Sequence, residues 1–242
     1  TRIQPAALGL LASLGIAQVE VLRRVRVAFF STGDEVLSLG EVPREGAVYD
    51  SNRYTLFGLL TRMGVEVLDM GVVRDDPAAL EAAFRSAAAQ ADAVITSGGV
   101  SVGEADHTKA IMRKLAGGDA GVVFWKIAMR PGRPMAVGRI DNAVLFGLPG
   151  NPVAVMVTFL AFVRPALLQM MGCKPEPLPM LRAQSQEAIR KKAGRTEYQR
   201  GQVTYAENGA LVVKTTGQQG SGVLSSMAQA NGLIVLHHDQ GN

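Results

Sequence analysis

The stretch VITSGGVSVGEAD (residues 94–106) decides the fold class, because a β-branched run passes directly into a turn rich in glycine and serine. Two further stretches, FFSTGDE (29–35) and LFGLPGNP (145–152), repeat this succession of strand and glycine-bearing turn. Glycine permits backbone angles closed to other residues and leaves amide N–H groups open to an anion. Ligands of open α/β sheets bind outside the carboxyl ends of the strands. We therefore expect the three turns to form one concave anion-binding rim.

On both sides of these turns, predicted strands alternate with predicted helices across residues 25–173. This alternation predicts an α/β fold, a three-layer α/β/α domain with a mostly parallel sheet and right-handed crossovers. The expected strands lie at 25–30, 65–73, 91–97 and 122–129, and in a hairpin over 135–148. The expected helices lie at 51–63, 77–90, 107–116 and 152–171.

The character of the sequence changes after Gly172. The stretch KPEPLP (174–179) is rich in proline, which is typical of a linker. Residues 177–242 consist of short alternating runs separated by Gly and Asn turns, which predicts a small antiparallel β-barrel domain. The sequence stops directly after a predicted strand and starts inside a predicted helix over 4–14, so we expect a truncated barrel and a fragment of a longer protein.

Composition limits the class of protein. The 242 residues are 48% hydrophobic and 19% charged, which indicates a globular chain with a sizeable core. The net charge of +4 fits an anionic small ligand, but the basic residues are scattered without stacking aromatics, so no nucleic-acid partner is expected. Cys173 is the only cysteine, which excludes an internal disulfide and favours the cytoplasm. The apolar stretch 152–163 is too short to span a bilayer, so no membrane partner is expected.

Acidic residues follow the predicted strands and are expected on the same rim: Asp34, Glu35, Asp75, Asp76 and Asp106. Carboxylates that face a phosphate need a cation between them, and Mg²⁺ is the usual one. The histidines do not stand at metal-ligand spacing, and no nucleophile with an adjacent base can be identified. The pattern therefore favours chemistry in which a metal and cations stabilise oxyanions.

The remaining motifs each allow two interpretations. The loop 97–108 has more glycines and hydroxyls than a turn needs, which favours an anion cradle over a plain loop, although it matches neither the Walker nor the dinucleotide spacing. The bend over 130–134 carries Arg130 and Arg133, which suit an oxyanion but could equally be solvated side chains of a stiff connection. Lys126 interrupts an apolar strand, so its ammonium group must reach water or an anion.

Together these motifs resemble the molybdopterin molybdotransferase family, also called the MoeA/gephyrin family. The matching motifs are STGDEV (31–36), YDSNRYTL (49–56), VRDDPAAL (73–80), SGGVSVGEADHTK (97–109), WKIAMRPGRP (125–134) and FGLPGNPVA (146–154), and the match continues into TEYQRG (196–201) and residues 217–233. The resemblance implies Mg²⁺-dependent insertion of molybdate into adenylylated molybdopterin with release of AMP. It also implies a homodimeric full-length protein, with residues 1–24 left from a missing N-terminal subdomain.

The resemblance implies roles for individual residues. Glu35, Asp75 and Asp106 are expected to position Mg²⁺ and substrate, with Lys126 beside them as a further catalytic residue. Residues expected to bind the pterin phosphates, the oxyanion or the neighbouring cleft are Thr32, Gly33, Asp34, Gly98, Gly99, Ser101, Gly103, Arg130, Arg133, Pro149, Asn151, Pro152, Arg200 and Ser221. The family often has lysine at positions 130 and 133, and many members have serine where this chain has Ala154.

Other readings of the sequence remain open. A molybdopterin adenylyltransferase shares the α/β domain and the glycine loop, although the β-rich tail and the turns at 130–134 and 148–152 favour the molybdotransferase. A scaffold is a second alternative, because some family members anchor receptor peptides, and an exposed apolar patch between the domains would favour it. A catalytically silent fragment is the third.

Overall fold

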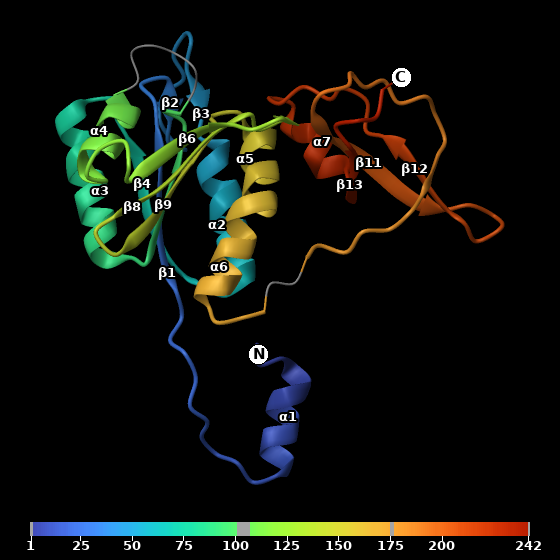
Figure 1. The fold of residues 1–242 in the computed structure, drawn as a ribbon, viewed down its shortest axis with the longest axis horizontal. Coiled ribbons are helices and arrows are strands. Elements are labelled where there is room, and N and C mark those ends of the chain that lie inside the picture. Colours follow the sequence, from blue (N-terminus) through green and yellow to red (C-terminus); the bar gives the residue numbers. More distant parts are fainter. Residues whose placement is uncertain (1, 101–106, 175–176, 242) are drawn as a thin grey trace.

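The computed structural model describes residues 2–100, 107–174 and 177–241. A six-stranded sheet lies between two layers of helices (Figure 1). The strands are β1 (Arg26–Thr32), β4 (Glu66–Val73), β5 (Ala93–Ser97), β6 (Val122–Lys126), β8 (Pro134–Ile140) and β9 (Ala143–Leu148). The helices are α2 (Ser51–Met63), α3 (Pro77–Gln90), α4 (His107–Leu115), α5 (Pro152–Thr158) and α6 (Arg164–Met170). The order across the sheet is β4-β1-β5-β9-β8-β6.

The layers follow from the burial of both faces of the central strands. Val27 and Phe29 of β1 belong to the core formed with α2, α5 and α6. Ala28 and Phe30 point to the other face, toward α3 and α4, where the Phe30 and Phe84 rings meet edge to face at 5.0 Å. Successive side chains of a strand point to opposite faces, so a strand buried on both sides is apolar throughout. The predicted mixed α/β fold with a parallel-rich sheet is confirmed.

Strand direction places several carboxyl ends at one edge of this sheet. β4, β1, β5 and β9 are mutually parallel, whereas β8 is antiparallel to β9 and β6 is antiparallel to β8. The predicted hairpin is confirmed, and Asp141 adopts φ 52° at its turn, a conformation that Asp tolerates better than most residues. Because the chain reverses direction between β9 and β8 and again between β8 and β6, β6 runs in the same direction as β9. The carboxyl end of β6 therefore lies at the same edge as those of the parallel strands.

The predicted helix after Asn151 continues from α5 through a π-helical segment, η1 (Phe159–Val163), into α6. The π segment directly precedes Arg164-Pro165, where proline has no N–H for the regular ladder. The run Pro152–Met170 spans 19 residues with mean hydropathy 1.8, so by length and composition alone it could cross a membrane. This corrects the expectation of a segment too short to do so. Half of the apolar window is nevertheless buried in the fold, with Phe159 and Leu167 in the core.

A second sheet contains β7 (Met129–Arg130), β10 (Gln184–Ser185), β11 (Thr196–Tyr205), β12 (Leu211–Thr215) and β13 (Gly232–Leu236), with α7 (Leu224–Gln229) beside it. β11 is antiparallel to β12 and β13, but β10 joins β12 in parallel and β7 joins β11 in parallel. The predicted antiparallel barrel is therefore not confirmed: the sheet is mixed, and within the described residues its end strands β10 and β13 do not pair. The predicted strand over 122–129 is divided, because its last part leaves the first sheet and joins the second.

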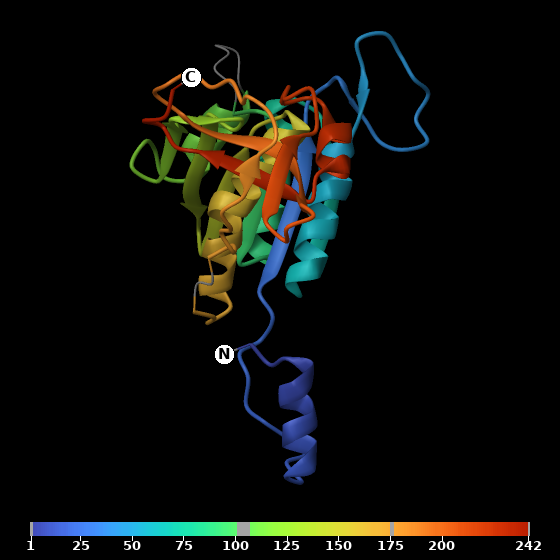
Figure 2. The ribbon, with the colours of Figure 1, turned by 90° about the vertical axis from the view of Figure 1, so that its right-hand side faces the viewer.

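Two small segments lie outside these sheets. β2 (Val36–Leu37) pairs in parallel with β3 (Val48–Tyr49), and the loop between them projects from the carboxyl edge (Figure 2). Helix α1 (Pro5–Ser13) buries no residue and lies apart from both sheets, at the opposite end from this loop (Figures 1 and 2).

Candidate functional site

A cavity of about 760 Å³ lies where the carboxyl ends of β1, β4, β5 and β9 meet, and we call it the rim cavity. The loops after β1 and β5, the start of α2 and the turn between β9 and α5 line it. The predicted site residues that line it are Thr32, Gly33, Glu35, Asp75, Gly98, Gly99, Asn151 and Pro152. The structure therefore brings together the three turns that the sequence analysis placed on one rim.

Close backbone contacts hold the turns together. The Gly98 N–H donates to the Leu148 carbonyl at 3.1 Å, which joins the end of β5 to the end of β9. A Cβ at Gly98 would lie 2.6 Å from the Thr32 carbonyl oxygen, and a Cβ at Gly150 would lie 3.8 Å from the Gly98 Cα. The Ser31 and Ser97 hydroxyls, buried at the ends of β1 and β5, hydrogen-bond at 2.9 Å. Glycine at position 98 is thus required by packing as well as by its φ of +92°.

The glycines also bring side chains over the loop backbone. A Cβ at Gly33 would lie 2.6 Å from Glu35 Oε2, so the Glu35 carboxylate folds over this glycine at the cavity. A Cβ at Gly99 would overlap the Thr108 side chain, which anchors the loop against the start of α4. The Thr108 hydroxyl is buried and has no hydrogen-bond partner among the residues that the structure describes. The close contact at Gly99 is with a β-branched side chain, whereas at Gly33 it is with the end of the flexible Glu35 side chain, so glycine is required by packing more strictly at position 99.

The acidic residues divide into those that line the rim cavity and those with structural contacts. Glu35 and Asp75 line it. Asp34 instead supports the loop, because its Oδ1 accepts from the Asp75 N–H at 3.2 Å and its carbonyl accepts from Arg44 and Arg74. The prediction that Asp76 lies on the rim is not confirmed, because Asp76 does not line the cavity. Its carboxylate instead caps α3 by accepting from Ala79 N at 2.8 Å. The predicted Ser101, Gly103 and Asp106 lie outside the described residues.

The donor set is compatible with Mg²⁺ but does not form a closed metal site. Among the described residues, no three His, Cys, Asp or Glu side chains gather as a metal cluster. Mg²⁺ is commonly held through one or two carboxylates together with substrate phosphates and water. Glu35 and Asp75 in one cavity match that arrangement.

The start of α2 contributes residues to which the sequence analysis gave no site role, although they lie in the motif YDSNRYTL (49–56). Asp50, Ser51 and Asn52 line the rim cavity, and Asn52 Nδ2 donates to the Gly150 carbonyl at 2.7 Å. Asp50 is 4% exposed, and its Oδ2 is buried without a partner among the described residues. The motif YDSN (49–52) could have indicated these cavity residues from the sequence. Its aspartate, however, is also a common helix cap, and that role alone explains its presence.

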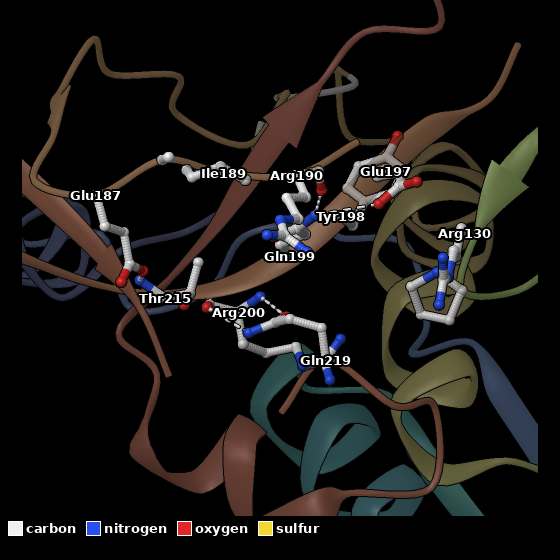
Figure 3. Close-up of a pocket in the computed structure, with 12 residues that line it drawn as sticks. Arg130, Glu187, Ile189, Arg190, Glu197, Tyr198, Gln199, Arg200, Thr215 and Gln219 are labelled. Atoms are coloured by element: carbon white, nitrogen blue, oxygen red, sulfur yellow. Dashed lines mark hydrogen bonds between the residues drawn. The ribbon is translucent and has the colours of Figure 1, made fainter. Parts of the chain in front are cut away.

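A second cavity of about 280 Å³ lies between the bend after β7 and the second sheet, and we call it the arginine cavity (Figure 3). Arg130 and Arg200, both predicted site residues, line it. Arg200 is 1% exposed; its Nε donates to Ser226 Oγ at 2.9 Å, and its NH2 donates to the carbonyls of Gln218 and Gly220. Burial, together with the positive charge of Arg130, lowers the pKa of Arg200 below its usual value.

The acids in the arginine cavity do not neutralise these arginines. Hydrogen bonding to the Thr215 side chain and to the Thr215 N–H, the latter at 2.6 Å, lowers the pKa of the Glu187 carboxyl. Glu197 accepts from Gln199 Nε2 at 3.1 Å. Among the described residues no ion pair joins either acid to Arg130 or Arg200. Arg200 is thus a buried cation that favours an incoming anion.

The other predicted residues lie near these cavities without lining them. Lys126 ends β6 at the carboxyl edge, and Arg133 lies across the following turn, where its carbonyl accepts from Ile127 N at 2.8 Å. Both side chains are exposed. Pro149 is buried in the turn after β9, and the Ser221 carbonyl accepts from Val153 N at 3.1 Å, which ties the second sheet's loop to α5.

Comparison with known proteins places these features in one family. Residues 28–169 match the family described as "Probable molybdopterin binding domain", and residues 182–242 match the "MoeA C-terminal region (domain IV)". The molybdopterin molybdenumtransferase of Haemophilus influenzae is 44% identical over 242 residues, which are 100% of this chain and 59% of that protein. The corresponding Nostoc protein is 37% identical, with 98% of this chain and 54% of that protein covered.

Solved structures agree with the sequence matches. Two crystal structures of the molybdopterin biosynthesis MoeA protein from Pyrococcus horikoshii superpose with TM-scores of 0.80 and 0.75, at 30% and 27% identity. They cover 99% and 98% of this chain, but only 56% and 55% of their own chains. The chain spans little more than half the length of the relatives it matches. It belongs to the MoeA family of molybdopterin-binding proteins and contains the molybdopterin-binding domain and the C-terminal region of that family.

Proposed function

We propose that the protein is a molybdopterin molybdenumtransferase, which inserts molybdate into adenylylated molybdopterin and releases AMP. The observation that carries this proposal is the rim cavity, in which three glycine-bearing turns meet beside the Glu35 and Asp75 carboxylates. The Haemophilus influenzae and Nostoc relatives bear the name of this activity, which supports the same assignment.

The turns after β1, β5 and β9 would hold the phosphate groups of the substrate. Gly98 and Gly99 both have positive φ and bend the chain so that this loop lines the cavity, although the Gly98 N–H itself is bonded to the Leu148 carbonyl. Thr32 and Asn151 line the same cavity and supply further hydrogen-bonding groups. Glu35 and Asp75 would hold Mg²⁺, which supplies positive charge between the carboxylates and the phosphates when bound.

The arginine cavity would attract molybdate, which is an oxyanion. Arg200 is held in place by three hydrogen bonds, so its guanidinium is presented without reorganisation. Arg130 lines the same cavity, and the exposed Lys126 and Arg133 add positive charge nearby. Insertion of the metal then depends more on holding two substrates close together than on proton transfer.

AMP release from adenylylated molybdopterin by the purified protein tests the proposal. We expect release that requires both molybdate and Mg²⁺, and an Asp75→Asn variant slower by at least about tenfold, equivalent to about 1.4 kcal/mol of barrier. Glu81→Gln is the control, because Glu81 binds Lys114 and Arg85 on the helical surface. Transfer of AMP from ATP onto molybdopterin would instead identify an adenylyltransferase, and molybdate-independent release would contradict the proposal.

An apolar hollow favours a scaffold role as a second candidate. It has a volume of about 500 Å³, lies between the α5–α6 run and the second sheet, and is lined by Leu160, Phe162, Met180 and Leu233. Exposed apolar hollows of this kind mark interaction sites, and Met180 is 69% exposed. Peptides selected from a random library should bind the wild type but not Met180→Glu, while AMP release stays unchanged. Failure to select any such peptide would remove this candidate.

A further inference from the structure

Asp50 has one more oxygen than its structural contact uses. Its Oδ1 accepts from the Arg53 N–H at 3.0 Å and thereby caps α2. Serine would make the same cap with one oxygen and no charge. The other carboxylate oxygen, Oδ2, is buried without a hydrogen-bond partner among the described residues. A buried charged acceptor that the helix does not require calls for a ligand, because such groups are rarely left unpaired.

Asn52 presents a second acceptor of the same kind. Its Nδ2 donates to the Gly150 carbonyl at 2.7 Å. This contact fixes the orientation of the amide, since a carbonyl can accept only from the NH₂ side. The opposite atom, Oδ1, is buried and also has no partner in the described part of the chain.

Both acceptors belong to one cavity, and no cation among the described residues donates a hydrogen bond to either of them, although the charge of Arg53 acts on Asp50. Asp50 and Asn52 lie two positions apart at the start of α2 and line the rim cavity. The Arg53 guanidinium is engaged elsewhere, because its Nε donates to both oxygens of Asp69 at 2.7 and 2.9 Å. No Lys, Arg or His is found among the described residues that line the cavity. The complementary group is therefore one that presents N–H donors.

We propose that Asp50 and Asn52 bind the N–H donor edge of the pterin ring, formed by the 2-amino group and the adjacent ring N–H. This edge distinguishes a pterin from a ring that carries oxygen at the same position, so Asp50 determines specificity for the ring. The inference rests on the proposed function, which supplies a pterin as ligand. An edge with two adjacent N–H donors matches two acceptors that lie two residues apart at the start of α2. Mg²⁺ fits them less well, because it retains several waters in a near-octahedral shell.

Binding of 6-hydroxymethylpterin and of its 2-oxo analogue, 6-hydroxymethyllumazine, tests the inference. Both are titrated by ligand fluorescence in EDTA, so that no divalent cation contributes. The wild type should prefer the pterin by at least about tenfold, as expected for a hydrogen bond to a buried charge. Asp50→Asn keeps the cap, because Asn caps helices as well as Asp, but replaces the Oδ2 acceptor with a donor. This variant should bind the two rings within about twofold of each other.

Asp76→Asn is the matched control. Asp76 caps α3 through an equivalent hydrogen bond to Ala79 N, at 2.8 Å, and it does not line the rim cavity. This variant should retain the full preference for the pterin. Asp50→Ser, which keeps the cap and lacks Oδ2, provides a second variant should Asp50→Asn fail to fold, and thermal melting checks both.

The outcomes separate this inference from the proposed function. If the wild type binds the pterin but the Asp50 variants keep its preference for the pterin, the inference is overturned while the proposed function stands. A preference that appears only with added Mg²⁺ would assign Asp50 to cation binding and also overturn it. If the wild type binds no pterin and shows no molybdate-dependent AMP release, both are overturned.

Discussion

Gly98→Ala should destabilise the rim through two separate effects. Gly98 has φ +92°, and placing a side chain in a left-handed conformation costs about 1–2 kcal/mol. The new Cβ would also lie 2.6 Å from the Thr32 carbonyl oxygen, which belongs to the buried end of β1. Forcing extra volume against such an atom costs about 1–3 kcal/mol. We therefore expect the free energy of unfolding to fall by about 2–5 kcal/mol in total.

Two other glycines separate these effects. Gly209 has φ +81° and nothing within 4 Å of an added Cβ, so Gly209→Ala should show only the conformational cost of about 1–2 kcal/mol. An added Cβ at Gly150 would make only an ordinary contact, 3.8 Å from the Gly98 Cα, so Gly150→Ala should stay within about 0.5 kcal/mol of the wild type.

Urea unfolding followed by circular dichroism measures all three variants, with a common slope used to convert midpoints to free energies. A Gly98→Ala loss no larger than that of Gly209→Ala would mean that the contact with Thr32 relaxes without cost. A loss as small as that of Gly150→Ala would refute the argument that the ends of β1 and β5 are closely packed.

Three further changes test other parts of the fold. Hydrogen bonds from Arg23 lower the pKa of Asp92 to about 2, so this stabilisation is present above the unfolded value of 3.8 and is lost as the pH falls through 2. Because the Arg23 side chain is 65% exposed, Asp92→Asn should cost only about 1 kcal/mol at pH 6, and the cost should shrink as the pH falls from 3.8 through 2 in urea unfolding. Arg200→Lys keeps the charge but loses the planar fork, and the same assay should show a loss of about 1–3 kcal/mol. Phe84→Ala removes a fully buried ring and should cost about 3–5 kcal/mol, and an unchanged midpoint would contradict the packing of α3 on the sheet.

Local sequence signals were sufficient to predict most helices and strands of the first sheet and its two helical layers. The start of α3 was predictable because Asp76-Pro77 combines a cap with a proline whose missing N–H is not needed there. The β8–β9 hairpin was predictable because Asp141-Asn142 separates two apolar runs. Such features depend only on neighbouring residues, so the sequence contains them directly.

Pairing between distant segments was not predictable in the same way. The run VVFWKIAM (122–129) has the apolar pattern of one strand. In the structure, however, Met129 and Arg130 belong to the second sheet, where they pair with Thr196 and Glu197 of β11. Helix α7 was missed because its six residues are held by tertiary contacts, among them the bond from Arg200 to Ser226. These features depend on contacts more than 20 residues apart, which local periodicity does not record.

In the candidate site, too, some residues were predictable from the sequence and others only from the structure. The glycines of the rim were predictable because their backbone angles and close contacts require glycine. Asp50 was not predictable, because a capping role fully accounts for aspartate at that position in the sequence. Only the structure shows that one of its oxygens is buried beside the cavity without a partner in the described part of the chain.

The two cavities differ in charge, and this difference explains the need for two compartments in the proposed reaction. Three acids, Glu35, Asp50 and Asp75, line the rim cavity, and no basic residue is found among its described lining. Any oxyanion would be repelled there without a cation such as Mg²⁺ between the charges, since two like charges about 4 Å apart interact by about 4 kcal/mol near a protein surface. The arginine cavity is lined by Arg130, Arg190 and Arg200 together with two acids, Glu187 and Glu197, and β7 brings Arg130 there by pairing with β11. The division of the predicted strand at residues 127–128 is therefore what places Arg130 in the arginine cavity.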